Sequence, residues 1–413
     1  MYIVNIHRIH QTLPATVTRL SGSAMDTSAA GIDDAWLRVD GDSIGAFGSM
    51  SALTPDMLAG HEVVDAAGGD IVPGFCDSHT HIIYAGTRDG EFLDKIMGLS
   101  YEEIAARGGG ILNSADLLHG TSEDSLFGQS MERAREIMAK GTVAFEVKSG
   151  YGLTVEDELK MLRVAARIRE AVPATVRITF LGAHAVGRAY AGRQSEYVDM
   201  LIRDMLPAVA AQGVADYVDV FCDRGFFTVD ETDRILEASA RYGLRPKIHA
   251  NELDCSGGVQ TGVRHGALSV DHLERMGDDE IDVLRGSGTV ATMLPGASFF
   301  LGMPYAPARR SVDAGLTVAL ASDYNPGSSP SGDMRMVWAL GCIRMRLTPA
   351  EALSACTLNG AAALGLSGRL GAVTPGREAS FTLTRPVPSL AFIPYAYTSP
   401  WIRQVYIKGK ALE

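Results

Sequence analysis

Residues 71–81 read Ile-Val-Pro-Gly-Phe-Cys-Asp-Ser-His-Thr-His, an apolar, β-prone run that ends in an acid and two histidines. Seven more runs of this kind follow along the chain, and amphipathic helical patterns such as 155–171 and 228–242 separate them. The eight runs are 71–77, 142–148, 176–181, 217–222, 246–250, 267–271, 289–294 and 317–322. Continuous apolar strands that alternate with helices are typical of a parallel sheet buried on both faces.

Eight such strands predict an α/β fold, a (β/α)8 TIM barrel, with an open doubly wound sheet as the competing arrangement. The two chain ends are different, because they alternate in the manner of antiparallel strands, as in 36–39 and 43–47 around the turn Asp40-Gly41-Asp42. We therefore expect residues 1–72 and 365–413 to form one small composite β-sandwich domain. Residues 73–364 would form the catalytic barrel.

Composition restricts the class of protein. The 413 residues carry 37 basic and 49 acidic side chains, a net charge of −12, which argues against non-specific nucleic-acid binding. The five cysteines are an odd number, widely spaced and without a CxxC pair, which favours a reducing cytoplasm over a disulfide framework. No signal peptide is expected at the N-terminus, and prolines interrupt the longest uncharged stretch, 286–308, so no membrane association is expected either.

Polar residues close several of the predicted strands, where a barrel places its active site. His79 and His81 are two apart, so in an extended chain they point to the same side and can hold one metal ion, although exposed histidines at a strand end would have the same spacing. His249 ends the fifth run, and alone it would more often be structural. Asp323 closes an apolar run, where a buried carboxylate is costly unless it is paired or metal-bound.

Together, His79, His81, His249 and Asp323 supply three imidazoles and one carboxylate to a divalent ion and leave room for a water. Such an ion lowers the pKa of the water to roughly 7 and so creates a hydroxide nucleophile at neutral pH. Glu252 follows in a loop and could act as a general base or cap the next helix. This chemistry is hydrolysis at a carbon that bears nitrogen or oxygen.

The segment 73–81 resembles the first-strand signature of the amidohydrolase superfamily. The likeness extends over nearly the whole chain to one of its families, the imidazolonepropionases. Five further segments carry it: Ala85-Gly86-Thr87-Arg88, 100–104 with Gly108-Gly109-Gly110-Ile111, Lys148-Ser149-Gly150-Tyr151-Gly152-Leu153, Phe180-Leu181-Gly182-Ala183-His184 and Asp323-Tyr324-Asn325-Pro326-Gly327-Ser328.

This resemblance implies hydrolysis of a ring C–N bond of 4-imidazolone-5-propanoate to N-formimidoyl-L-glutamate in histidine breakdown. It also implies one zinc or iron ion per subunit, and a homodimer. The implied metal ligands are His79, His81, His249 and Asp323; the implied substrate-binding residues are Arg88, Tyr151, His184, Glu252, Asn325, Gly327 and Ser328. We expect Glu252, His272 and Asp323 to carry the proton transfers. The glycines 108–110 would permit a mobile lid.

Each of these residues also has a structural reading. Arg88 suits the propionate carboxylate as a planar fork, but it could form a surface ion pair. Tyr151 could be simple packing, and His184 and His272 could be satisfied core histidines. Some relatives use a modified lysine to bridge two metals, whereas we expect one metal here, with Lys148 either structural or paired with Glu146.

Two other functions remain open. A related amidohydrolase or deaminase could act on another nitrogen heterocycle, although a nucleobase has no propionate for Arg88 to bind. A non-catalytic barrel would tend to lose metal ligands, and all four are present.

Overall fold

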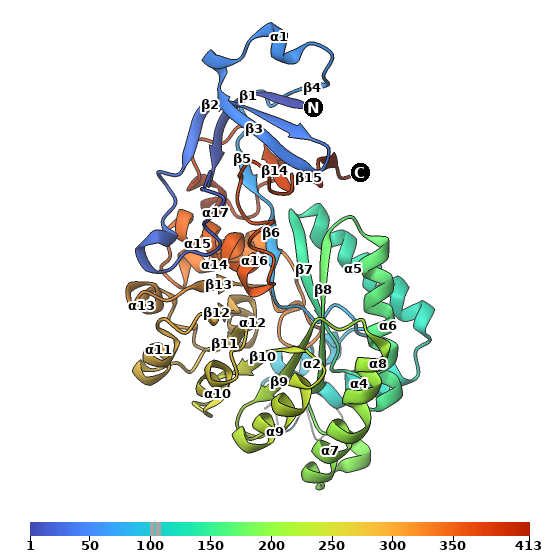
Figure 1. The fold of residues 1–413 in the computed structure, drawn as a ribbon. Coiled ribbons are helices and arrows are strands. Elements are labelled where there is room, and N and C mark those ends of the chain that lie inside the picture. Colours follow the sequence, from blue (N-terminus) through green and yellow to red (C-terminus); the bar gives the residue numbers. More distant parts are fainter. Residues whose placement is uncertain (100–102, 104–108) are drawn as a thin grey trace.

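A computed structural model describes residues 1–99, 103 and 109–413. Eight strands follow one another in a parallel sheet in chain order, and helices cover their outer side (Figure 1). The strands are β6 (Phe75–Asp77), β7 (Thr142–Lys148), β8 (Thr175–Ala183), β9 (Tyr217–Cys222), β10 (Arg245–Ala250), β11 (Ser269–His272), β12 (Val290–Met293) and β13 (Val318–Leu320). This order confirms the predicted barrel.

The intervening helices lie between consecutive strands or follow the last one. They are α2 (Asp89–Ile96), α4 (Ile111–His119), α5 (Glu123–Ala139), α6 (Val155–Ala171), α7 (Gln194–Met200), α8 (Leu206–Gln212), α9 (Val229–Ala240), α10 (Gly258–Arg264), α11 (Asp278–Leu284), α12 (Pro295–Leu301), α13 (Ala308–Asp313), α14 (Met334–Ile343), α15 (Pro349–Cys356) and α16 (Leu358–Ala363). Local signals set several of these bounds. For example, α6 begins where the Thr154 hydroxyl accepts a hydrogen bond from the Asp157 N–H at 3.1 Å.

The barrel closes just beyond β6 and β13. Thr80 and Tyr324 form a parallel bridge, the Asp323 N–H donates to the His79 carbonyl at 3.0 Å, and the His81 N–H donates to the Tyr324 carbonyl at 2.9 Å. The Asp77 carboxylate also accepts from the Ser322 N–H at 3.0 Å and the Ser322 hydroxyl at 2.5 Å. The first and last strands are therefore joined at the residues that carry the predicted metal ligands.

The run 71–77 is two strands, which corrects the prediction of a single barrel strand. Residues Ile71–Pro73 form β5 of a second sheet, and Phe75–Asp77 form β6 of the barrel. Gly74 lies between them, where a Cβ would meet Val143 Cγ1 at 2.3 Å. The apolar sequence gives no sign that the chain passes from one sheet to the other here, because both strands are fully buried.

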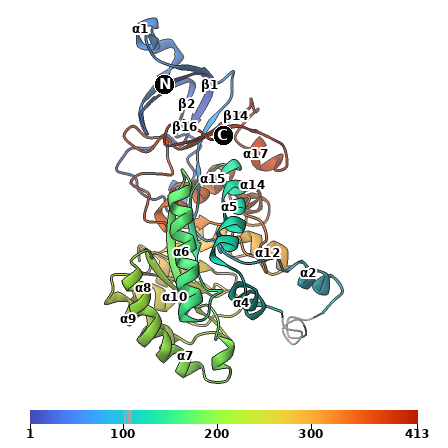
Figure 2. The same cartoon turned by 90° about the vertical axis from the view of Figure 1, so that its right-hand side faces the viewer.

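The two chain ends form the second sheet, as predicted. Its order is β16-β15-β14-β5-β1-β2-β3, and β4 pairs with β1. The strands are β1 (Tyr2–His10), β2 (Gly31–Asp40), β3 (Ser43–Ser49), β4 (Val63–Asp65), β5, β14 (Phe381–Thr384), β15 (Ile402–Ile407) and β16 (Lys410–Ala411), with the short helices α1 (Pro55–Leu58) and α17 (Phe392–Tyr395). Figure 2 shows this sheet at one end of the molecule and α2 projecting from the side of the barrel.

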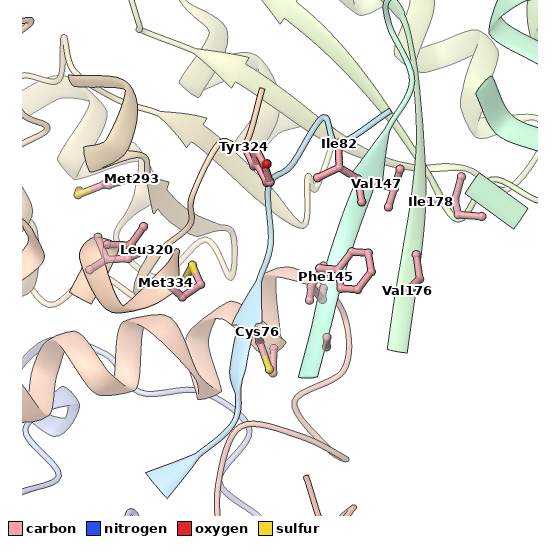
Figure 3. Packing of buried hydrophobic residues seen from close by; sticks show 14 of the residues in the cluster. Cys76, Ile82, Phe145, Val147, Val176, Ile178, Met293, Leu320, Tyr324 and Met334 are labelled. Carbon is pink, nitrogen blue, oxygen red and sulfur yellow. The ribbon is translucent and has the colours of Figure 1, made fainter. Parts of the chain in front are cut away.

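The two largest buried hydrophobic clusters belong to the two sheets. One lies in the second sheet around Ile9, Ile71 and Phe381, and a larger one fills the barrel and its helix layer (Figure 3). Along β7, Phe145 and Val147 pack in that larger cluster, while Glu146 and Lys148 point to the opposite side of the strand. Burial on both faces explains the continuous apolar runs, and the charged exceptions mark the barrel interior.

Within residues 1–99, 103 and 109–413, no helix has both the length and the apolar character that crossing a membrane requires. Residues 100–102 and 104–108 of the quoted 100–111 segment, and with them the first glycine of the predicted lid, lie outside the described residues.

Candidate active site

The four predicted metal ligands meet at the barrel mouth. His79 Nε2 and His81 Nε2, which follow β6, are 3.2 Å apart. His249, on β10, places its Nε2 3.4 Å from His81 Nε2, and Asp323, which follows β13, has its Oδ1 3.5 Å from His79 Nε2 and 3.6 Å from His81 Nε2. All four residues are buried, and groups from this cluster meet the geometric requirement for holding a metal ion.

Carboxylates behind the histidines fix which ring nitrogen faces the centre. His79 Nδ1 lies 2.7 Å from Asp271 Oδ2, and His249 Nδ1 lies 2.9 Å from Asp219 Oδ2. A carboxylate only accepts, so Nδ1 carries the proton and Nε2 presents a lone pair. Burial lowers the pKa of His249 to about 4, against the opposing effect of Asp219, and lowers the pKa of His79 and of His81 well below 6.5.

The donor set fits a metal ion. Two neutral imidazole lone pairs fixed in this way, a third imidazole from His81 and a carboxylate oxygen face one another, and a cation satisfies all of them at once. Histidine and carboxylate ligands are those that zinc and iron take in proteins.

A layer of buried charges lies behind this cluster in the barrel interior. Lys148 Nζ is 2.9 Å from Glu146 Oε2 and 2.7 Å from Asp219 Oδ2, which confirms the predicted ion pair with Glu146. Lys247 Nζ donates to Glu146 Oε2 at 2.8 Å and to the Ser78 carbonyl at 2.6 Å. Although burial alone would lower it, the neighbouring carboxylates raise the pKa of Lys148. The lysine is therefore an ammonium paired with acids.

Asp219, Asp271 and Lys247 are parts of the site that were not predicted from the sequence. Each is a fully buried charge in a barrel strand, and around Asp219 that strand is otherwise apolar, Tyr217-Val218-Asp219-Val220. The cost of burying a charge, which singled out Asp323, would have identified them too. That signal indicates a buried partner without saying which one.

Glu252 and His272 lie side by side next to the cluster. His272 Nε2 is 3.6 Å from Glu252 Oε2, and His272 Nδ1 is 3.5 Å from Glu274 Oε2. Burial raises the pKa of Glu252 to about 7. For His272, burial alone would lower the pKa, but Glu252 and Glu274 raise it well above 6.5. The pair can hold or release a proton near neutral pH, as a general acid or base must.

Unusual backbone conformations occur at the same places. Asn251, His272 and Asp323 have φ values of 59°, 86° and 55°, in the left-handed region that costs a non-glycine residue of order 1–3 kcal/mol. Each follows or ends a barrel strand. Strain of this kind persists where the surrounding structure holds the residues in place. His272 and Asp323 line one cavity, whereas Asn251 Nδ2 donates to the Arg275 carbonyl at 2.8 Å.

One cavity of about 740 Å³ is lined by all seven predicted substrate-binding residues and by three of the four predicted metal ligands. The predicted residues in its wall are His81, Arg88, Tyr151, His184, His249, Glu252, His272, Asp323, Asn325, Gly327 and Ser328. Much of the remaining wall is apolar, including Phe221, Phe299 and Phe300. This volume suits a small organic ligand.

His184 and Tyr151 form one side of the cavity. The His184 ring stacks on His81 with centroids 5.3 Å apart and an interplanar angle of 17°, and its Nδ1 donates to the Gly150 carbonyl at 3.0 Å. The other nitrogen of His184 is then free to accept from a ligand. Buried Glu158, another residue that the sequence analysis missed, holds the loop that carries Tyr151, because its carboxylate accepts from the N–H groups of residues 150, 152 and 153 at 2.8–3.2 Å.

The turn after β13 uses its polar groups internally. Asn325 Oδ1 accepts from the Gly327 and Ser328 N–H groups at 2.8 Å each, and Asn325 Nδ2 donates to the Asp323 carbonyl at 2.7 Å. The Ser328 hydroxyl lies 3.2 Å from Asp323 Oδ2. The turn therefore positions Asp323 and forms part of the cavity wall, and the assignment of Asn325, Gly327 and Ser328 to substrate binding stays a prediction.

Arg88 lies at the other end of the cavity. Its Nε and one terminal nitrogen donate to Glu91 Oε2 at 2.9 and 2.6 Å, and Glu91 also accepts from the Gly110 N–H at 3.1 Å. A Cβ on Gly327 would meet the remaining terminal nitrogen of Arg88 at 2.1 Å. Only glycine allows the guanidinium to lie this close to the turn.

Comparison with known proteins agrees with this geometry. The model of the amidohydrolase family matches residues 71–412. An imidazolonepropionase of Christiangramia forsetii is 48% identical over 412 residues, with 100% of both chains covered, and one of Flavobacterium johnsoniae is 48% identical over 410 residues, with 99% of both covered.

Solved structures support the fold. A triazine hydrolase variant has a TM-score of 0.72 at 17% identity, covering 100% of this chain and 94% of that one. An adenosine deaminase of Xanthomonas campestris with bound zinc has a TM-score of 0.67 at 15% identity, covering 99% and 92%. From the family match and the full-length relatives, we conclude that this chain belongs to the amidohydrolase family and, within it, to the imidazolonepropionases.

Proposed function

We propose that this protein hydrolyses 4-imidazolone-5-propanoate to N-formimidoyl-L-glutamate, a step of histidine breakdown. The observation that carries the proposal is the single cavity with a metal-ligand cluster and a proton-transfer pair at one end and Arg88 at the other. A substrate with a reactive ring and a carboxylate tail matches these two ends. The full-length relatives named imidazolonepropionase support the same substrate.

His79, His81, His249 and Asp323 would hold one ion per subunit, which we propose is zinc or iron. When bound, such an ion polarises a carbonyl group and lowers the pKa of a bound water. Asp271 keeps His79, and Asp219 keeps His249, in the tautomer that has its proton on Nδ1 and leaves Nε2 for the metal.

In the reaction, the water oxygen forms a bond to the ring carbonyl carbon, the ring C–N bond breaks, and a proton from the water reaches the leaving nitrogen. Glu252 is placed to accept that proton, and His272, 3.6 Å away, to stabilise the resulting charge and assist the transfer. Asp323, 3.5 Å from His79 and 3.6 Å from His81, would take part in the proton transfer as well as bind metal. His184 and Tyr151 would orient the ring, and Arg88 the propionate.

A deaminase acting on another heterocycle is the competing proposal. The adenosine deaminase with a similar fold shows that the barrel is compatible with such chemistry. Arg88 separates the two proposals, because a nucleobase has no carboxylate for a guanidinium to bind.

The test is to offer 4-imidazolone-5-propanoate, generated from urocanate by urocanase, and to follow the loss of its ultraviolet absorbance. Metal analysis of the purified protein identifies the ion. Turnover that is lost on chelation and restored by zinc or iron is the expected result. Turnover of cytosine, guanine or adenosine without any on the imidazolone would overturn the proposal. We further propose a homodimer in the cytoplasm, which light scattering and cell fractionation would test.

A further inference from the structure

The carboxylate end of the cavity contains more charge than Arg88 alone. Arg88 donates two hydrogen bonds to Glu91 at 2.9 and 2.6 Å, and their side chains are only 9% and 10% exposed. A buried pair of this geometry is electrically neutral at a distance. Arg88 can therefore give direction to a carboxylate but cannot by itself balance its charge.

A second cation lies at the same place. Lys95 lines the cavity, and its Nζ donates to the Gly327 carbonyl at 3.1 Å. Gly327 is also the residue whose Cα faces the free terminal nitrogen of Arg88. Lys95 belongs to α2 and Arg88 is its N-cap, seven residues earlier, so the two side chains leave the helix on the same face. Both cations thus meet at one residue of the cavity wall.

No acidic residue in the described part of the chain pairs with Lys95. Among residues 1–99, 103 and 109–413, no carboxylate lies within 4.0 Å of its ammonium group. Its other described contact is with the Phe300 ring, 5.5 Å from Nζ to the centroid. Burial lowers the pKa of Lys95 and Arg88 lowers it further, with Glu91 opposing them. Among the described residues, Arg88, Lys95 and Glu91 give this end of the cavity one more positive than negative charge.

We infer that Lys95 is a specificity-determining residue, which supplies the positive charge that binds the carboxylate tail of the substrate, while the Arg88–Glu91 pair orients it. This inference rests on the proposed function for the identity of the tail. It assigns a role to a residue that the sequence motifs did not single out.

The test compares Lys95→Met, which keeps the length of the side chain, with Lys95→Arg, which keeps the charge. Lys410→Met on the exposed edge of the second sheet is the matched control, since it removes the same charge elsewhere. Each variant is assayed on 4-imidazolone-5-propanoate and on its neutral propanamide. A charge-assisted hydrogen bond predicts that Lys95→Met raises KM for the propanoate by about 10- to 100-fold. Lys95→Arg and Lys410→Met should stay within about threefold of the parent protein, a range of less than 1 kcal/mol.

The propanamide distinguishes recognition from a structural role. If Lys95 recognises the carboxylate, kcat/KM on the amide is the same with and without the Met substitution. An equal loss on both substrates would show that Lys95 only supports the Gly327 turn, and no loss on the propanoate would also overturn the inference.

A binding measurement separates this inference from the proposed function. Calorimetric titration of the propanoate into a Glu252→Gln background, with and without Lys95→Met, reports affinity without turnover. If the parent protein hydrolyses neither compound, the proposed function fails. The ratio of the two affinities, with and without Lys95→Met in the Glu252→Gln protein, still tests the inference, which requires weaker binding after Lys95→Met.

Discussion

The two ends of the cavity are built differently. At the metal end, the side chains come from the ends of barrel strands, and His79, His81, His249 and Asp323 are each 0–2% exposed. At the carboxylate end, Arg88 and Lys95 come from α2, a helix whose neighbouring residues Phe92 and Ile96 are 43% and 63% exposed. Figure 2 shows α2 at the edge of the barrel, away from the helices that pack against the strands.

This difference separates chemistry from recognition. Residues on closely packed strands keep the positions that metal binding and proton transfer require. Recognition of a charged tail tolerates more movement, and loops and peripheral helices supply it in many barrels. Changes at the metal end should therefore reduce bound metal or kcat, whereas changes at the carboxylate end should raise KM and leave the metal in place.

The largest effect is expected from the ligands. Replacing His79 or Asp323 by Ala removes a donor from a cluster whose members lie 3.2–3.6 Å apart, so both bound metal and activity should be lost. Metal analysis and the absorbance assay check this. A variant that kept its metal and full turnover would show that the cluster is not the metal site.

Glu252→Gln comes next, because it keeps the size of the side chain and removes the base. General bases contribute about 10²–10⁴-fold, so kcat should fall by that amount while metal content stays constant. If kcat changed less than about threefold, well below that range, the proton would have to go elsewhere, and His272→Asn would then be the variant to measure.

Arg88→Ala changes the carboxylate end of the cavity and should affect substrate binding rather than metal binding. Loss of the paired guanidinium should lower kcat/KM for the propanoate by about 100-fold, mainly through KM. Bound metal should not change. An unaltered KM would contradict the assignment of this end to the carboxylate, and a loss of metal would contradict the separation of the two ends.

Asp271→Asn tests how the metal end is held. The change removes the charge behind His79 while leaving an oxygen that can accept from Nδ1. Such outer partners are worth about 10–100-fold in metal affinity, which competition with a chelator measures. Asp157→Asn is the matched control, because Asp157 Oδ2 lies 2.8 Å from His119 Nδ1 on the outside of the barrel. Equal affinities in the two variants would rule out a special role for Asp271.

The difference between residues on barrel strands and residues on a peripheral helix also explains what could be predicted from the sequence. Periodicity and strand-end position were enough for the barrel, for the second sheet and for the set of residues that meet in the cavity. The change of sheet at Gly74 was not predictable, because residues on both sides are equally apolar. Asp219 and Asp271 stood in predicted strands, but their partners come from other strands, and a linear pattern does not specify such pairings.

Lys95 was harder still to foresee. A lysine in an amphipathic helix is ordinarily a solvated surface charge. Its role depends on the neighbouring Arg88–Glu91 pair being neutral and on the carbonyl of Gly327, more than 200 residues away along the chain. Neither condition has a signature within the helix itself.

The smallest expected effect is the pH dependence, and it also distinguishes the two ends. Burial raises the pKa of Glu252 to about 7. A base acts only in its ionised form, so kcat/KM should be constant above this pH and should fall as the pH decreases through about 7, approaching tenfold per unit below it. Glu252 lies at the metal end, so KM for the propanoate, which depends on the carboxylate end, should change little over this range. Measuring bound metal at each pH separates this effect from release of the ion. A profile that is flat from pH 6 to 9 at constant metal content would contradict it, and so would a Glu252→Gln variant that keeps the same acidic limb, because the titrating group would then lie elsewhere in the cavity.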